Sequence, residues 1–368
     1  MGFLETLAEK IPFLTSNKLI GVDIGSFAIK IAEVVQKGNE YVLTTACYAE
    51  LPPTTIVEGS IMNSAAVTDT LIELIAECGI KVKQVATSVG GSSVIVKQIM
   101  VPNMTPDELD EQITWEAEQH ITFSVDEVNL AYHIIGESEV EPGKMDIILV
   151  AAKRDMISDY TTVLYEAGLT PVVIDIDAFA VMNVFEVNYP EEMENVVALV
   201  NIGASFTNVN IIKNGIPIVV RDFTIGSNSY TEEIQKNLGV SADEAEKLKR
   251  GDTESESGEE VISQEVVEII DSVSEIIAGE ISRTIDFYSV SHAEEKITKI
   301  MLSGGGTLTP GLQRIIEEKT DISTHFLNPF RNIKVAENLV SNKPEIVTKY
   351  APMMAVPVGL ALRRRDDS

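Results

Sequence analysis

The chain has 368 residues and a formal net charge of −29, because 57 acidic side chains outnumber 28 Lys and Arg. This charge argues against binding to nucleic acid or to an anionic bilayer, since both attract Lys and Arg through their phosphates. The length fits two domains or one bilobed domain, and 45% hydrophobic residues can form a large core. We find no run of about 18 apolar residues, so we expect no membrane-spanning helix.

The cysteines and histidines point to no special chemistry. The two cysteines, Cys47 and Cys78, are too few for a disulfide framework, and we expect core thiols in a reducing compartment. The four histidines show no metal-ligand spacing. Apolar side chains within residues 3–14 have amphipathic spacing, which predicts a helix packed on its own domain, with membrane or partner contact as the alternative.

The first part of the chain predicts strands separated by a helix, and hence an α/β fold. We expect a hairpin over 19–36, strands over 41–50 and 56–61, a helix over 67–78, and a buried strand over 85–89.

A unit of different character follows, with the order β-α-β-β-α. Its expected elements are strand 95–101, helix 107–120, strands 128–135 and 145–151, and helix 155–168. Thr105 and Glu108 form a capping box at the start of the first helix. On that helix we expect Trp115 to pack in the core, with a place in a binding groove as the alternative. Strand 172–176 and helix 178–187 return to the main domain.

Two segments repeat one pattern, about one domain length apart. In each, a buried strand reaches a polar residue, then Ile-Gly and a small residue, then a second β-branched strand. The polar residue is Asp23 in the first copy and Asn201 in the second. A turn of glycine and a small residue exposes backbone N–H groups to phosphate oxygens, and an Asp before it can hold hydrated Mg²⁺. Two such hairpins facing across a cleft would clamp a nucleotide.

A third element is strand 300–303, which ends in Gly304, Gly305 and Gly306 before a helix started by Pro310. Three glycines at a strand end are costly unless something must approach closely. Such a junction lets an adenosine lie against the backbone. Between the second hairpin and this element we expect strand 216–223, helices 227–239 and 241–249, an acidic loop over 252–260, and a long amphipathic helix from 261.

These elements, in this order, resemble the actin-like ATPase superfamily and, more closely, the PilM family of type IV pilus assembly proteins. The likeness covers about residues 18–365. The inserted subdomain and the ending Gly359–Arg363 favour PilM over its division-protein relative FtsA. Four stretches carry the likeness beyond the hairpins: 105–118, 146–169, 173–180 and 359–363.

The resemblance implies an α/β, actin-like bilobed fold of duplicated ribonuclease-H-like domains with an inserted β-α-β-β-α subdomain. The implied boundaries are 1–90 and 169–190 for the first lobe (1A), 91–168 for the inserted subdomain (1C), 191–230 and 298–368 for the second lobe (2A), and 231–297 for subdomain 2B.

The resemblance also implies site residues. They are Asp23, Gly25, Ser26 and Lys30 in the first phosphate hairpin, Asn201, Gly203, Ala204 and Thr207 in the second, Glu246 and Lys249 at ribose and base, and Gly304, Gly305 and Gly306 in the adenosine loop. Asp23 would hold the metal through water. Simpler interpretations are a surface ion pair for Glu246 and Lys249 and a solvent-reaching strand end for Lys30.

Asp175 falls near the acidic position that orients the attacking water in this superfamily. Of Asp175 and Asp177, we expect Asp175 to be the carboxylate that faces the cleft. The triplet Arg363–Arg365 is expected to offset acidic surface in the tail.

The family likeness implies a cytoplasmic, ATP-binding scaffold, peripheral to the cytoplasmic face of the inner membrane. It would bind ATP or ADP with Mg²⁺, hold the N-terminal cytoplasmic tail of PilN beside the inserted subdomain, and form a platform with PilN and PilO. Asn201 stands where the second hairpin usually carries Asp, so we expect slow or absent hydrolysis. The alternatives are an FtsA-like division or filament-forming actin homologue, a homo-oligomer included, and a small-molecule kinase.

Overall fold

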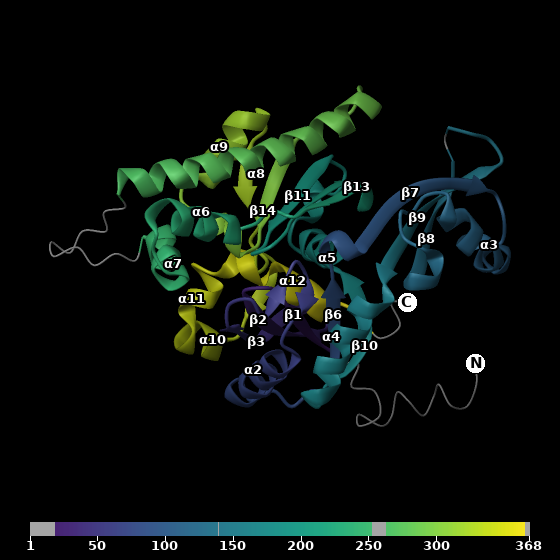
Figure 1. The fold of residues 1–368 in the computed structure, drawn as a ribbon. Coiled ribbons are helices and arrows are strands. Elements are labelled where there is room, and N and C mark those ends of the chain that lie inside the picture. The colour runs from purple at the N-terminus through teal and green to yellow at the C-terminus, as the bar shows by residue number, and fades with distance from the viewer. Residues whose placement is uncertain (1–18, 139, 252–262, 365–368) are drawn as a thin grey trace.

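Two sheets of like topology form the framework of the molecule, seen in the computed structural model of Figure 1. The structure describes residues 19–138, 140–251 and 263–364. The expected N-terminal helix and the acidic loop over 252–260 lie outside these residues.

Six strands form the first sheet, in the order β10-β6-β1-β2-β3-β16. They are β1 (Ile20–Ile24), β2 (Ala28–Lys37), β3 (Glu40–Glu50), β6 (Gln84–Val89), β10 (Thr170–Ile176) and β16 (Ile333–Val335). Strands β1, β2 and β3 run antiparallel, and β6 and β10 add in parallel beside β1. β1 and β6 are almost wholly buried, as expected for Val- and Ile-rich strands covered on both faces.

The second sheet repeats this plan in the order β15-β14-β11-β12-β13. Its strands are β11 (Val197–Ile202), β12 (Thr207–Lys213), β13 (Ile216–Phe223), β14 (Lys299–Ser303) and β15 (Thr324–Phe326). Again three antiparallel strands are followed by two parallel ones. The predicted duplication is therefore present.

Two helices lie between the sheets, α5 (Asp177–Asn188) and α12 (Ala355–Ala361) (Figure 1). Their buried faces share one apolar core with side chains of both sheets. The backbone comes unusually close here, because a Cβ on Gly359 would lie 1.8 Å from the Ala180 carbonyl oxygen, and one on Gly21 would lie 1.9 Å from that of Pro357.

The inserted unit is a three-stranded antiparallel sheet, β7-β9-β8, with one helix of its own. Its elements are β7 (Val94–Pro102), α3 (Pro106–Glu118), β8 (Val128–Glu137) and β9 (Lys144–Lys153). They enclose a separate core. The predicted capping box of Thr105 and Glu108 is present, but Trp115 is 62% exposed and does not pack in the core.

Two segments belong to a different part of the fold from the one that we expected. Helix α4 (Arg154–Glu166) packs its buried residues into the core of the first sheet beside α2 (Ser64–Glu77), and not into that of the inserted unit. Strand β16 pairs with β3 of the first sheet, although the expected boundaries assign residues 333–335 to the second lobe. Both differences arise from long-range packing that local sequence patterns do not encode.

Most of the remaining helices cover the second sheet, and two short ones lie beside the first. They are α6 (Asn228–Leu238), α7 (Ala242–Arg250), α8 (Gln264–Ser291) and α9 (Leu312–Thr320), while α10 (Glu337–Asn342) and α11 (Pro344–Val347) lie towards β3. The long helix α8 packs an apolar face on the sheet. None of the described helices combines the length and apolar character needed to cross a membrane.

Cys47 and Cys78 form a disulfide in the structure, which corrects the expectation of free thiols. Cys47 lies on β3 and Cys78 follows α2, and their Cα atoms are 6.7 Å apart. Packing of the helix on the sheet brings the two residues together across 31 residues of sequence.

Candidate functional site

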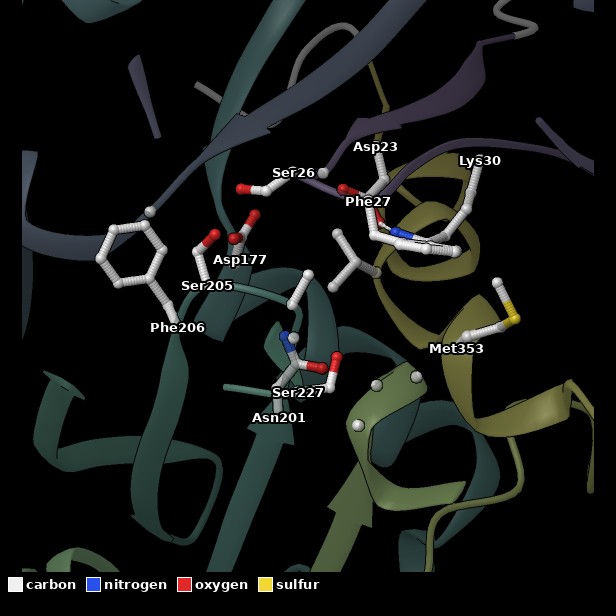
Figure 2. Close-up of a pocket in the computed structure, with 18 of the residues that line it drawn as sticks. Asp23, Ser26, Phe27, Lys30, Asp177, Asn201, Ser205, Phe206, Ser227 and Met353 are labelled. Atoms are coloured by element: carbon white, nitrogen blue, oxygen red, sulfur yellow. Dashed lines mark hydrogen bonds and ion pairs between the residues drawn. The ribbon is translucent and has the colours of Figure 1, made fainter. Parts of the chain in front are cut away.

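The cleft between the two lobes holds a pocket of about 260 Å³ (Figure 2). This volume is close to the roughly 300 Å³ at which small-molecule sites begin. Twelve predicted residues line it: Asp23, Gly25, Ser26, Lys30, Asn201, Gly203, Ala204, Glu246, Lys249, Gly304, Gly305 and Gly306. Segments far apart in the sequence thus meet at one site.

The first hairpin presents an ion pair to the pocket. Asp23 and Lys30 lie opposite each other in the register of β1 and β2, and Lys30 Nζ lies 2.8 Å from Asp23 Oδ2. The Gly25 N–H closes the turn by donating to the Ala28 carbonyl. Lys30 therefore neutralises Asp23 within the pocket, and the simpler interpretation of a solvent-reaching lysine is wrong.

The second hairpin has the same turn, since the Gly203 N–H donates to the Phe206 carbonyl 2.8 Å away. Asn201 Oδ1 accepts from the Ser303 hydroxyl at 3.3 Å, which ties the end of β11 to that of β14. Thr207 departs from the prediction: its side chain is fully buried, donates to the Ile225 carbonyl, and does not line the pocket. Ser205, next to Ala204 in the turn, lines the pocket instead.

The three glycines that follow β14, Gly304–Gly306, serve two purposes. A Cβ on Gly304 would lie 2.3 Å from the Ile202 carbonyl oxygen, and one on Gly306 would lie 2.5 Å from Ile202 Cγ2. These two glycines therefore let the loop pack against the end of β11. A Cβ on Gly305 would meet only Met353, at 3.9 Å, so this residue leaves room in the pocket.

Asp177, and not Asp175, faces the pocket. Asp175 is buried and accepts from the backbone N–H of Ile176 and from Arg363 Nε, at 2.7 Å. Asp177 begins α5 and accepts from the Ser88 hydroxyl at 2.5 Å. Figure 2 shows it pointing into the same part of the pocket as Ser26 and Ser205. The expectation for Asp175 is corrected because β10 ends at Ile176, and the helix start turns the next carboxylate inward.

The same contact corrects the expectation for the C-terminal arginines. Arg363 binds the buried Asp175, and Arg364 donates to Gln36 at 2.9 Å, so neither merely offsets surface charge. Arg365 lies outside the described residues.

Burial and the negative charge of Asp23 raise the pKa of Asp177 to about 7, against the opposing effect of the Ser88 hydrogen bond. Burial also raises the pKa of Asp222, which lines the pocket from β13. Asp222 accepts from Asn208 Nδ2 at 2.7 Å and from the N–H of Gly91, between β6 and β7, at 3.0 Å. The cleft thus contains one carboxylate, Asp177, whose pKa lies near neutral pH, and a second, Asp222, whose pKa is raised by burial.

Glu246 and Lys249 form a partly buried pair 2.5 Å apart on α7. Thr231 on α6 donates to Glu246 and lies 3.1 Å from Lys249 Nζ. Burial opposes ionisation of Glu246, but Lys249 outweighs it and lowers the pKa of that carboxyl. The interpretation of a plain surface pair is therefore wrong, and the pair faces the pocket beside the Gly304–Gly306 loop.

Several residues of the site escaped sequence reasoning. Ser205 could have been found, because it lies in the predicted turn. Ser88, Asp222 and Arg250 line the pocket because their strands and helices converge there, and no local pattern marks them.

A family model described as type IV pilus assembly protein PilM matches residues 21–365. The chain is similar to a solved structure titled PilM-PilN type IV pilus biogenesis complex, with 26% identity over 94% of this chain and 98% of that one and a TM-score of 0.82. It also resembles the ethanolamine utilization protein EutJ from Carboxydothermus hydrogenoformans, with 15% identity over 95% and 90% of the chains and a TM-score of 0.56.

MreB5 of Spiroplasma citri, solved with AMPPNP, has 13% identity over 94% and 95% of the chains and a TM-score of 0.50. At such identities EutJ and MreB5 share the fold alone, and they confirm the expected actin-like architecture. The family model, in contrast, spans both lobes and the inserted unit. The chain therefore belongs to the PilM family of type IV pilus assembly proteins.

Proposed function

We propose that this chain is an ATP-binding scaffold of the type IV pilus inner-membrane platform that holds the N-terminal cytoplasmic tail of PilN. The observation that supports a nucleotide is the meeting of two glycine turns and the Gly304–Gly306 loop around one interlobe pocket. The similarity to a PilM-PilN complex supports the partner. Contact with PilN and PilO would keep the protein at the cytoplasmic face of the inner membrane.

The pocket residues suit a nucleoside triphosphate or diphosphate. Ser26 and Ala204 place small side chains at the two turns, where phosphate oxygens can approach the backbone. The carboxylate of Glu246 can accept hydrogen bonds from ribose hydroxyls, and the open space at Gly305 admits the base. Lys30 and Lys249 supply positive charge towards the phosphates and ribose.

The residues fit Mg²⁺ only through water. In the described part of the chain, no three His, Cys, Asp or Glu side chains converge as metal ligands. Asp23 already holds Lys30 on one oxygen, and Asn201 offers an uncharged amide oxygen. A hydrated ion bound through its waters to Asp23 and Asn201 would neutralise phosphate charge.

We propose that hydrolysis is slow or absent. Asn201 lacks the negative charge that Asp would supply at the second hairpin, so it binds the metal and activates water less well. Asp177 lines the pocket, and its raised pKa suits a group that orients water or accepts a proton. Binding without rapid turnover suits a scaffold whose lobes are held closed by a ligand that contacts both.

Filament formation receives less support than the scaffold function. A filament requires complementary head-to-tail faces. The likeness to MreB5 is of fold alone, whereas the PilM family model spans the inserted unit as well.

Calorimetric titration of the full chain with a synthetic PilN-type N-terminal peptide, in Mg-ATP, tests the proposal. We expect saturable one-to-one binding, no binding of a scrambled peptide of equal composition, and little phosphate release from the same sample. Absence of peptide binding, with nucleotide bound in the cleft, would contradict the scaffold function and favour a filament or division role.

A further inference from the structure

Arg250, the last residue of α7, reaches from the second lobe to the first across the pocket. Its Nε donates to Glu246 Oε1 at 2.9 Å within the same helix. Its Nη2 lies 3.4 Å from Glu50 Oε1, at the end of β3 in the first lobe. Its guanidinium carbon lies 5.4 Å from the centroid of the Phe27 ring, in the turn of the first hairpin.

All four side chains of this group line the pocket. Phe27 and Glu50 approach Arg250 from one lobe, while Glu246 orients the guanidinium from the other. The planar guanidinium can face a ring and bind carboxylates through separate N–H groups at once, which a lysine cannot do. The arrangement therefore joins the two lobes beside the proposed ribose position.

We propose that Arg250 is an interlobe clasp that slows release of the nucleotide from the cleft. This inference rests on the proposed nucleotide site and adds a positioning residue to it. Opening the lobes would separate Arg250 from Glu50 and Phe27 while leaving its bond to Glu246 intact. The contacts that are lost therefore add to the barrier for opening, and Glu246 keeps the guanidinium aimed for reclosure.

Solvent exposure of Arg250 and Glu50 limits how much their contact can slow nucleotide release. The side chains of Arg250 and Glu50 are 41% and 52% exposed, so the ion pair is partly screened by water. A partly exposed cation–π contact adds a comparable stabilisation. Together they predict a change in release rate of about threefold to tenfold.

The test is stopped-flow release of a fluorescent ATP analogue, carrying an N-methylanthraniloyl group, from the full chain when chased with excess ATP. We expect Arg250→Ala to release the analogue about threefold to tenfold faster than the unaltered chain, with little change in association. Arg250→Lys should be intermediate, because it can keep the ion pair and loses the planar stacking. Arg314→Ala is the matched control, since Arg314 also pairs with a Glu four residues away, but on α9 and away from the pocket.

Two further measurements separate the clasp from general weakening of the site. Glu50→Gln and Arg250→Ala should be non-additive in a double-mutant cycle, because each removes the same ion pair. Added salt should speed release from the unaltered chain more than from Glu50→Gln. Equal release rates for Arg250→Ala and the unaltered chain would overturn the clasp and leave the nucleotide site standing, whereas absence of analogue binding to the unaltered chain would overturn both.

Discussion

At the residue scale, we expect the buried carboxylate of Asp177 to make the stability of the molecule depend on pH. Its neighbours in the pocket are Asp23, with its partner Lys30, and Asp222, and its hydrogen-bond donor is Ser88. Lys30 lies directly against Asp23, whereas the group in hydrogen-bond contact with Asp177 is the uncharged Ser88 hydroxyl. Burial therefore acts on Asp177 with little compensation.

The raised pKa of Asp177 means that the free energy of unfolding should fall as pH rises. In the unfolded chain Asp177 loses its proton near pH 4, whereas in the folded protein it does so near pH 7. The folded state therefore binds the proton more tightly, and the contribution of Asp177 to the free energy of unfolding is fully present below pH 4 and is lost as pH rises to about 7. Asp177→Asn should therefore be more stable than the unaltered chain at pH 8, by about 2 to 4 kcal/mol, and should lose that advantage towards pH 4. Urea unfolding across this range measures it.

Asp286→Asn on the exposed face of α8 provides the control for that comparison. It removes one acidic charge without touching the pocket. A similar gain at pH 8 in both variants would show that lost surface repulsion, and not the buried carboxylate, explains the effect.

At the scale of elements, the close contact between α12 and α5 requires a glycine at position 359. A Cβ on Gly359 would lie 1.8 Å from the Ala180 carbonyl oxygen, a backbone atom that cannot move without its helix. Gly359→Ala should force the helices apart and lower the free energy of unfolding by about 1 to 3 kcal/mol. Because these helices lie between the lobes, nucleotide affinity should fall as well.

Gly279 on α8 offers the matched control, since a Cβ there would meet no atom within 4 Å. Gly279→Ala should raise the free energy of unfolding by about 0.5 to 1 kcal/mol, through the higher helix propensity of alanine. Chemical denaturation of both variants decides the matter: a loss of stability in Gly279→Ala, or none in Gly359→Ala, would contradict the packing argument.

At the scale of the whole molecule, the net charge of −29 acts against the folded state, because folding brings like charges together. Salt screens this repulsion over distances beyond about 10 Å at 0.1 M. Raising NaCl from 50 to 500 mM should therefore stabilise the chain, by on the order of 1 kcal/mol. Urea titrations at the two salt concentrations measure the change, and a fall in stability would mean that attractive ion pairs outweigh the general repulsion.

The sequence by itself determined most of the elements and most of the residues that line the pocket. A hairpin sets its own register, so Asp23, Gly25 and Lys30 could be placed together from one short segment, and the repeat at Asn201 and Gly203 followed from the same local rule. The order of strands and helices, together with the family likeness, then fixed the bilobed architecture.

Only the tertiary structure decided which side chains face one another across the cleft. Asp177 turns inward because a helix begins there, and Asp175 is held by Arg363, which lies 188 residues further along the chain. Arg250 meets Glu50 across 200 residues. Such contacts depend on how whole elements pack, and the period of a strand or helix fixes only the direction of a side chain relative to its own element.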